Sequence, residues 1–299
     1  MSTPAEAAIT AGRTRAARLV LLWHRTGWSL RIGALILLVH LLVAVFGPWL
    51  ASYDPNEMGS GIPLSGASWA HPFGVDQLSR DIFSRVLNGS HIVIILSLSG
   101  TFVGLTVGAA IGLFSAYMGG WVDELIQRTV EAFVSIPFIV LGLLAVYAAG
   151  PESAGKPALM VLVIALLYAP RVARMARSAG LDIITHDYVL AARLRGERVW
   201  SVIWFELAPN VISTLIVEFA VRTAYAPALV ATFGFLGFGI QPPTPEWGSI
   251  ISENRGIFLL SPVAVLGPGA CLASLIVAVN MVTEGVSRLI GQRVEIASR

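Results

Sequence analysis

Long apolar segments alternate with short polar ones along most of this chain. Six segments reach the length of about 20 residues that a helix needs to cross the hydrocarbon core of a bilayer. These segments are 28–51, 91–118, 127–149, 157–176, 209–238 and 262–289. The fourth is the weakest, because its purely apolar part, 158–169, is too short to span a bilayer unaided. The sequence therefore predicts an all-α integral membrane protein with six transmembrane helices.

The composition agrees with a chain whose residues mostly face lipid or other protein. Of the 299 residues, 56% are apolar and 13% are charged, and the mean hydropathy is +0.76. Soluble domains carry about 25% charged residues. The net charge of +2 is too small to favour a nucleic-acid partner. A single cysteine, Cys271, excludes an intrachain disulfide and a metal site built from several cysteines.

The basic residues between the apolar segments are distributed unevenly. With six spans, four of the 20 lysines and arginines fall on one side of the membrane: Arg80, Arg85, Lys156 and Arg255. The polar residues at both ends of the chain and in 187–209 fall on the other side, together with most of the arginines. Cytoplasmic loops carry the excess of Lys and Arg. We therefore expect both termini and the segment 187–209 to be cytoplasmic.

This topology divides the chain into three parts. Residues 1–90 would form a cytoplasmic N-terminal tail, the first transmembrane helix and an external segment. Residues 91–289 would form the transmembrane core, and 290–299 a cytoplasmic C-terminal tail. A signal peptide is the alternative for the N-terminal region, but the apolar run that follows is too long for one. Whether residues 16–28 form a helix that lies on the membrane surface stays open.

Small residues recur at helical spacing in the second segment. Gly100, Gly104, Gly108 and Gly112 are four residues apart, so they share one helix face. Small residues on one face let helices approach closely in lipid. The row predicts a tight contact inside the bundle, with a seam against a partner chain as the alternative. Pro137 and Pro227 are expected to bend the third and fifth helices.

The most polar stretch inside the predicted core is 187–209, which we call the coupling segment. It reads as an amphipathic helical turn with small residues at Ala191 and Ala192, a glycine break at Gly196, and a second short helix. Arg193 would keep the segment out of the bilayer and offer charge to an acidic partner. Pro209 suits the first turn of the next membrane helix.

The coupling segment resembles the EAA loop of permease subunits of ABC importers. Further stretches are similar to the dipeptide, oligopeptide and nickel branch of that family: 71–85, 119–124, 241–245 and 246–248. The resemblance extends from about residue 68 to residue 293. Within the family, the chain most resembles the second (C-type) permease of a dipeptide transporter.

This resemblance implies a type I ABC importer permease in the cytoplasmic membrane of a prokaryote. The residues expected to dock into an ATPase subunit are Asp187, Tyr188, Ala191, Ala192, Arg193, Gly196 and Pro209. The implied partners are a second homologous permease, two ATP-binding subunits or one two-domain ATPase, and an extracytoplasmic substrate-binding protein. ATP and Mg²⁺ would bind to the ATPases, and this chain would hold no cofactor. The implied cargo is a peptide, with nickel, haem or another small solute as alternatives.

Motifs for catalysis are missing from the sequence, which argues against an enzyme. Residues 150–157 nearly match a phosphate loop, but Pro157 stands where a hydroxyl residue would reach Mg²⁺, and an apolar segment precedes it instead of a strand. No catalytic residue and no metal ligand is assigned. A secondary transporter driven by an ion gradient is the chief alternative class, and an intramembrane enzyme is a weaker one.

Two opposite charges lie deep inside the fifth apolar segment. Glu218 and Arg222 are four residues apart and share a helix face, and Arg222 is about 20 Å along its helix from Pro209. Charges at this depth usually pair with one another or face a water-filled path. We expect a self-neutralising pair, a polar lining of the translocation path, or both.

Overall fold

The computed structural model describes residues 27–297, with side chains described as far as residue 288. The expected cytoplasmic tail at 1–25 and most of the surface helix considered at 16–28 lie outside the described residues. In chain order the elements are α2 (Trp28–Leu50), α3 (Ile82–Met118), α4 (Gly120–Ser135), α5 (Phe138–Ala148), α6 (Pro157–Ile183), α7 (Asp187–Leu194), α8 (Val199–Val202), η1 (Ile203–Leu207), α9 (Ala208–Phe235), α10 (Trp247–Asn254), η2 (Arg255–Ile257) and α11 (Val263–Ala297).

The described chain is helical, as predicted, and five of its helical runs are long and apolar enough to cross a membrane. They are α2, α3, α6, the run Val199–Phe235 and α11. The pair α4 and α5 makes a sixth span only if both helices count together, because they are bent by 99° relative to each other. The third predicted span, 127–149, is therefore not one straight helix. Its break lies at Pro137, which has no N–H for the helical hydrogen bond and obstructs the preceding turn.

The fourth span was the weakest in the sequence, yet it forms one continuous helix, Pro157–Ile183. The helix passes through Arg171 and Arg174 because its other faces are buried against α3 and α9. The second span begins at Ile82, nine residues before the predicted start at His91. Asp81 caps this earlier start, since its carboxylate accepts a hydrogen bond of 2.7 Å from the Ser84 N–H.

Pro209 lies in the first turn of α9, as expected, but α9 is not separated from the helix that precedes it. The short helix α8 passes through a single π-helical turn, η1, directly into α9. In a regular α-helix the Pro209 ring would press on the carbonyl four residues earlier. The wider π turn ends just before Pro209, where Ala208 donates its N–H to the carbonyl of Ile203. The helix therefore continues past the proline. It also continues through Pro227, which is buried inside α9.

The contact between α3 and α6 is the most extensive helix pairing in the described part of the chain. A Cβ atom added at Gly104 would lie 3.0 Å from the Ala165 Cα atom, and one at Gly108 would lie 2.5 Å from the Ala169 carbonyl oxygen. At Gly112 it would lie 2.2 Å from the Ala173 carbonyl oxygen. The glycine row that includes Gly100 thus faces α6 of the same chain along several turns.

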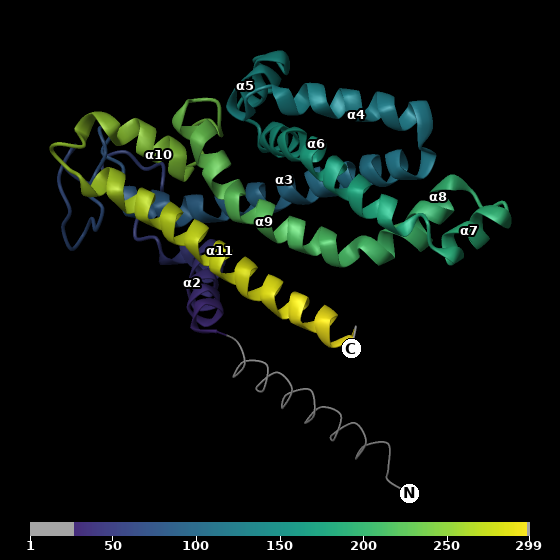
Figure 1. The fold of residues 1–299 in the computed structure, drawn as a ribbon. Coiled ribbons are helices and arrows are strands. Elements are labelled where there is room, and N and C mark those ends of the chain that lie inside the picture. Colours follow the sequence, from purple (N-terminus) through teal and green to yellow (C-terminus); the bar gives the residue numbers. More distant parts are fainter. Residues whose placement is uncertain (1–26, 298–299) are drawn as a thin grey trace, which may run out of the picture.

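The remaining helices pack around this pair, as Figure 1 shows. Helices α2 and α11 run beside each other, joined by a hydrogen bond of 2.9 Å between the His40 imidazole and the Ser274 hydroxyl. Helices α4 and α5 lie over α6 on the other side of the bundle. The coupling segment with α7 and α8 is at one end, and α10 is at the other, with the irregular segment 51–81 (Figure 1).

Gly112→Ala tests how much the fold depends on the close α3–α6 contact. The added methyl group has no room beside the Ala173 carbonyl, and overpacking of this kind costs about 1–3 kcal/mol. We expect a lower melting temperature of the purified protein and less protein in the membrane. Gly269→Ala in α11 is the matched control, because nothing lies within 4 Å of its added Cβ atom. Equal melting temperatures for the two variants would contradict the argument.

Candidate functional site

Helix α7 presents one face to solvent and buries the other. Val189 and Ala192 are fully buried, whereas Leu190 and Leu194 are exposed by 53% and 80%. The two alanines of the coupling segment therefore differ: Ala192 packs into the protein and Ala191 is exposed. Asp187 and Tyr188 are also on the exposed side. The exposed face thus carries large apolar side chains beside the small Ala191.

Gly196 ends α7 in a Schellman motif. Its φ angle is +72°, a left-handed conformation that favours glycine, and nothing lies within 4 Å of an added Cβ atom. The Gly196 N–H donates to the carbonyl of Arg193, and the next N–H, of Glu197, donates to that of Ala192. The glycine is therefore required for the backbone conformation, and the space around it stays open.

The arginines of the coupling segment have specific local partners. Arg193 donates a hydrogen bond of 2.9 Å to the Tyr117 carbonyl at the end of α3, and its guanidinium lies 4.2 Å from the centre of the Tyr117 ring. Arg195 pairs with Glu197, and this hydrogen bond holds the pKa of the Glu197 carboxyl below its usual range. Arg193 thus ties α7 to the transmembrane core, a role that the sequence did not indicate.

An apolar cluster connects α7 to three transmembrane helices. Val189 and Ala192 share this cluster with buried side chains of α3, α6 and the run from η1 into α9. The other members include Leu113, Ala176 and Leu207. Since packed interiors transmit displacement, a force on the exposed face of α7 would act directly on the ends of these helices.

The predicted pair in the fifth span forms. Arg222 Nε donates to a Glu218 carboxylate oxygen at 2.7 Å, and Arg222 Nη2 donates to the same oxygen. The two side chains are exposed by 21% and 18%, so the pair is neither sealed in the core nor freely solvated. The Arg222 guanidinium also lies 5.4 Å from the centre of the Tyr168 ring on α6.

A second charged cluster, at the opposite end of the bundle, was missed in the sequence. Asp76 and Glu253 together bind two arginines, Arg80 and Arg85, in contacts of 2.6–3.1 Å. Arg85 is fully buried. Burial alone would raise the pKa of Glu253, but the hydrogen bonds and charges of Arg85 and Arg80 outweigh it and lower that pKa. The cluster joins segment 51–81, α3 and α10. Asp76 and Arg80 have a spacing that hinted at it; Glu253, far away in sequence, gave no signal.

The turn into α10 buries another carboxylate. Glu246 is fully buried and caps α10 by accepting hydrogen bonds from the N–H groups of Gly248 and Ser249 at 2.8 and 3.0 Å. Trp247 beside it donates to the Val86 carbonyl of α3. Burial raises the pKa of Glu246 to about 7, against the opposing effect of its two backbone hydrogen bonds. The charged cluster and this cap together fix the position of α10.

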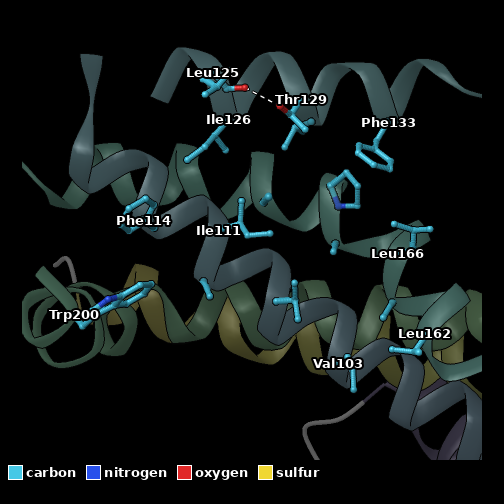
Figure 2. A pocket seen from close by; sticks show the side chains of 17 residues that line it. Val103, Ile111, Phe114, Leu125, Ile126, Thr129, Phe133, Leu162, Leu166 and Trp200 are labelled. Atoms are coloured by element: carbon cyan, nitrogen blue, oxygen red, sulfur yellow. Dashed lines mark hydrogen bonds between the residues drawn. The ribbon is translucent and has the colours of Figure 1, made fainter. Parts of the chain in front are cut away.

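A long apolar groove runs between α3, α4 and α6, with Trp200 of α8 at one end (Figure 2). Its volume is about 730 Å³. Figure 2 shows side chains such as Ile111, Phe133 and Leu166 pointing into it. The Thr129 hydroxyl in its wall donates to the Leu125 carbonyl of its own helix. The groove therefore offers apolar surface and no charged group to bind a polar solute.

The described residues thus combine long apolar helices, a polar pair inside one of them and a short helix with one exposed face at one end. The chain belongs to the family of binding-protein-dependent transport system inner membrane components, whose model matches residues 108–296. It is therefore a multi-pass protein of the inner membrane. The family is one of transport components, which decides against the enzyme and against the ion-driven transporter.

Curated relatives match almost the whole chain. The probable D,D-dipeptide transport system permease protein DdpC of Escherichia coli is 33% identical, over 90% of this chain and 90% of the relative. The dipeptide transport system permease protein DppC of Haemophilus influenzae is 30% identical, over 85% and 87%. The glutathione transport system permease protein GsiD of Pectobacterium atrosepticum is 30% identical, over 84% and 83%.

A solved structure supports the fold. A chain of the MetNI methionine ABC transporter in an inward-facing conformation superposes with a TM-score of 0.54 at 19% identity, covering 69% of this chain and 96% of that chain. The predicted importer-permease fold is thereby confirmed.

The Glu246 cap predicts a pH-dependent stability. Because the pKa in the folded protein is about 7 and that of an unfolded glutamate is about 4.5, the folded protein binds the extra proton between these values. The contribution of Glu246 to stability is therefore fully present below about pH 4.5 and is lost as the pH rises to about 7, by up to about 3 kcal/mol. Glu246→Gln should lessen this fall, because a glutamine does not titrate. Melting temperatures between pH 5 and pH 8 measure the difference, and parallel curves for both proteins would contradict it.

Proposed function

We propose that this chain is one permease subunit of an ATP-driven importer of dipeptides or short peptides. The observation that supports this mechanism is the packing of α7, which is exposed on one face and buried on the other against α3, α6 and α9. The cargo is inferred from the relatives, whose names are those of dipeptide and glutathione transport permeases.

In this proposal the coupling segment docks into a cleft of an ATPase subunit. Asp187, Tyr188 and Ala191 contribute to the docking face, and Gly196 and Arg193 hold that face in place. ATP and Mg²⁺ bind in two ATPase subunits or one two-domain ATPase. Closure of the ATPases pushes on α7, and the apolar cluster beneath it moves the ends of three transmembrane helices. This coupling selects between inward-facing and outward-facing states.

The remaining partners follow from the same proposal. A second, homologous permease supplies the other half of the translocation path, and an extracytoplasmic binding protein delivers the peptide. Glu218 and Arg222 line the path from α9. Their position inside α9 supports this assignment, because charges within membrane helices usually face the bundle interior or a water-filled cavity.

Ala191→Trp tests the docking face. Ala191 is exposed, so the variant should fold normally and reach the membrane in wild-type amounts, whereas the bulky ring obstructs the ATPase. We expect uptake and substrate-stimulated ATP hydrolysis by the complex to fall at least tenfold. Met58→Trp, an exposed position in segment 51–81, is the control that should keep both activities. Normal stimulated hydrolysis in Ala191→Trp would refute the docking role. Ala192→Trp should differ from both by losing stable protein, since Ala192 is buried.

The charged pair in α9 is tested by single and double substitution. Arg222→Met strands the Glu218 carboxylate in a partly buried site. Breaking a fully buried pair costs about 3–5 kcal/mol, so we expect a smaller loss here, seen as less Arg222→Met protein in the membrane. Adding Glu218→Leu should restore its abundance, because apolar residues can replace both partners without loss. The double variant should nevertheless take up less peptide. Wild-type abundance together with wild-type uptake would remove the pair from the path.

A further inference from the structure

Arg171 lies at the middle of α6, at the same depth as Arg222 in α9. Residue 171 is 14 positions after Pro157 and 12 before Ile183, the ends of α6. Residue 222 is 13 positions before Phe235, the end of the continuous helical run that begins at Val199. At 1.5 Å per residue, each arginine is therefore about 20 Å from the end of its helix that is expected to be external, Pro157 for α6 and Phe235 for α9. Both charges thus originate at a similar depth.

These two arginines differ in their partners. The guanidinium of Arg222 is occupied by the Glu218 carboxylate. Arg171 donates to the Leu167 carbonyl of its own helix at 3.2 Å and lies 4.8 Å from the centre of the Phe138 ring. Among the side chains that the structure describes, no carboxylate pairs with Arg171. Its charge remains uncompensated within this part of the chain.

The surroundings of Arg171 concentrate positive charge beside aromatic rings. Arg171 lies close enough to Arg174 and to Arg222 for each of these charges to repel its own. The Phe138 and Tyr168 rings are 6.1 Å apart, and each carries one of the guanidinium groups on its face. With one carboxylate against three arginines, the site favours an anion.

The position of Arg171 around α6 separates it from the apolar groove. Ala169 and Ala173 line that groove, and residue 171 is two positions from each. Two residues correspond to about 200° around a helix, so Arg171 lies on the face opposite the groove. A cation at this depth is strongly unfavourable in contact with lipid and usually faces water or a counter-ion.

We propose that Arg171 binds the carboxylate of the peptide as it crosses the membrane, and so acts as a specificity-determining residue of the path. A guanidinium binds a carboxylate through two parallel hydrogen bonds. Arg171 is free to do so, whereas the fork of Arg222 is already used by Glu218. This inference rests on the proposed import function, and it places the anion-binding group on α6, beside the pair on α9.

The test replaces the charge chemically. Arg171→Cys is made in a Cys271→Ala background, since Cys271 is the one native cysteine. The complete complex, with its ATPases and binding protein, is reconstituted in proteoliposomes and supplied with labelled alanyl-alanine. Uptake should fall at least tenfold in Arg171→Cys. The cationic reagent 2-aminoethyl methanethiosulfonate should restore at least a third of the wild-type rate, and neutral methyl methanethiosulfonate should restore none.

A control and three opposing outcomes make the test decisive. Leu162→Cys, on the groove face of α6, should keep wild-type uptake with or without either reagent. Wild-type uptake by unmodified Arg171→Cys would overturn the inference, as would equal recovery with the neutral reagent. A thiol that neither reagent labels would overturn it too, because Arg171 would then contact lipid or a partner chain. Absence of uptake by the Cys271→Ala complex with Arg171 intact would instead count against the proposed peptide import.

Discussion

The near-contact of the α3 and α6 backbones organises the rest of the fold. Four glycines on α3 lack the side chains that would separate the helices; carbonyl groups of α6 lie against three of them and the Ile164 side chain lies against Gly100. Because α6 is held this closely, its central turns cannot rotate toward lipid, and Arg171 and Tyr168 stay next to α9 and the start of α5. The same contact brings Leu113 and Ala176 together in the apolar cluster that α7 packs against. A packing constraint in the membrane thus positions both the coupling surface and the charged groups.

The two ends of the bundle are fixed by different forces. At the α7 end an apolar cluster joins the coupling segment to three helices, and the joint is rigid because it is closely packed. At the α10 end, two arginines and two carboxylates join segment 51–81, α3 and α10, and Glu246 caps the turn. Buried ion pairs contribute little net stability, but they require a defined geometry of the groups that form them. In the proposed mechanism, the α7 end receives force from the ATPase and the α10 end keeps a defined surface.

Helices α6 and α9 differ in how the positive charge of their arginine is compensated. Glu218 neutralises Arg222 within one helix, so this pair can exist without any other chain. Arg171 has no such partner in the described chain and depends on whatever occupies the space beside it. An empty path would then hold water at Arg171, and a passing anion would replace that water. The break between α4 and α5 contributes by placing Phe138 over the guanidinium.

The sequence predicted a structural feature correctly wherever the residues of a single segment determine that feature. Apolar length placed the long helices, the four-residue spacing of glycines marked the α3 face that contacts α6, and the spacing of Glu218 and Arg222 placed them together. The conformation of Gly196 also follows from its position at a helix end. Contacts between distant segments could not be read in this way: Glu253 with Arg85, the Tyr117 carbonyl with Arg193, and Phe138 with Arg171 each depend on how separate helices pack. The 99° bend at Pro137 and the uninterrupted helix through Pro209 belong to the same group, because a proline weakens a helix locally while its neighbours decide whether the chain turns.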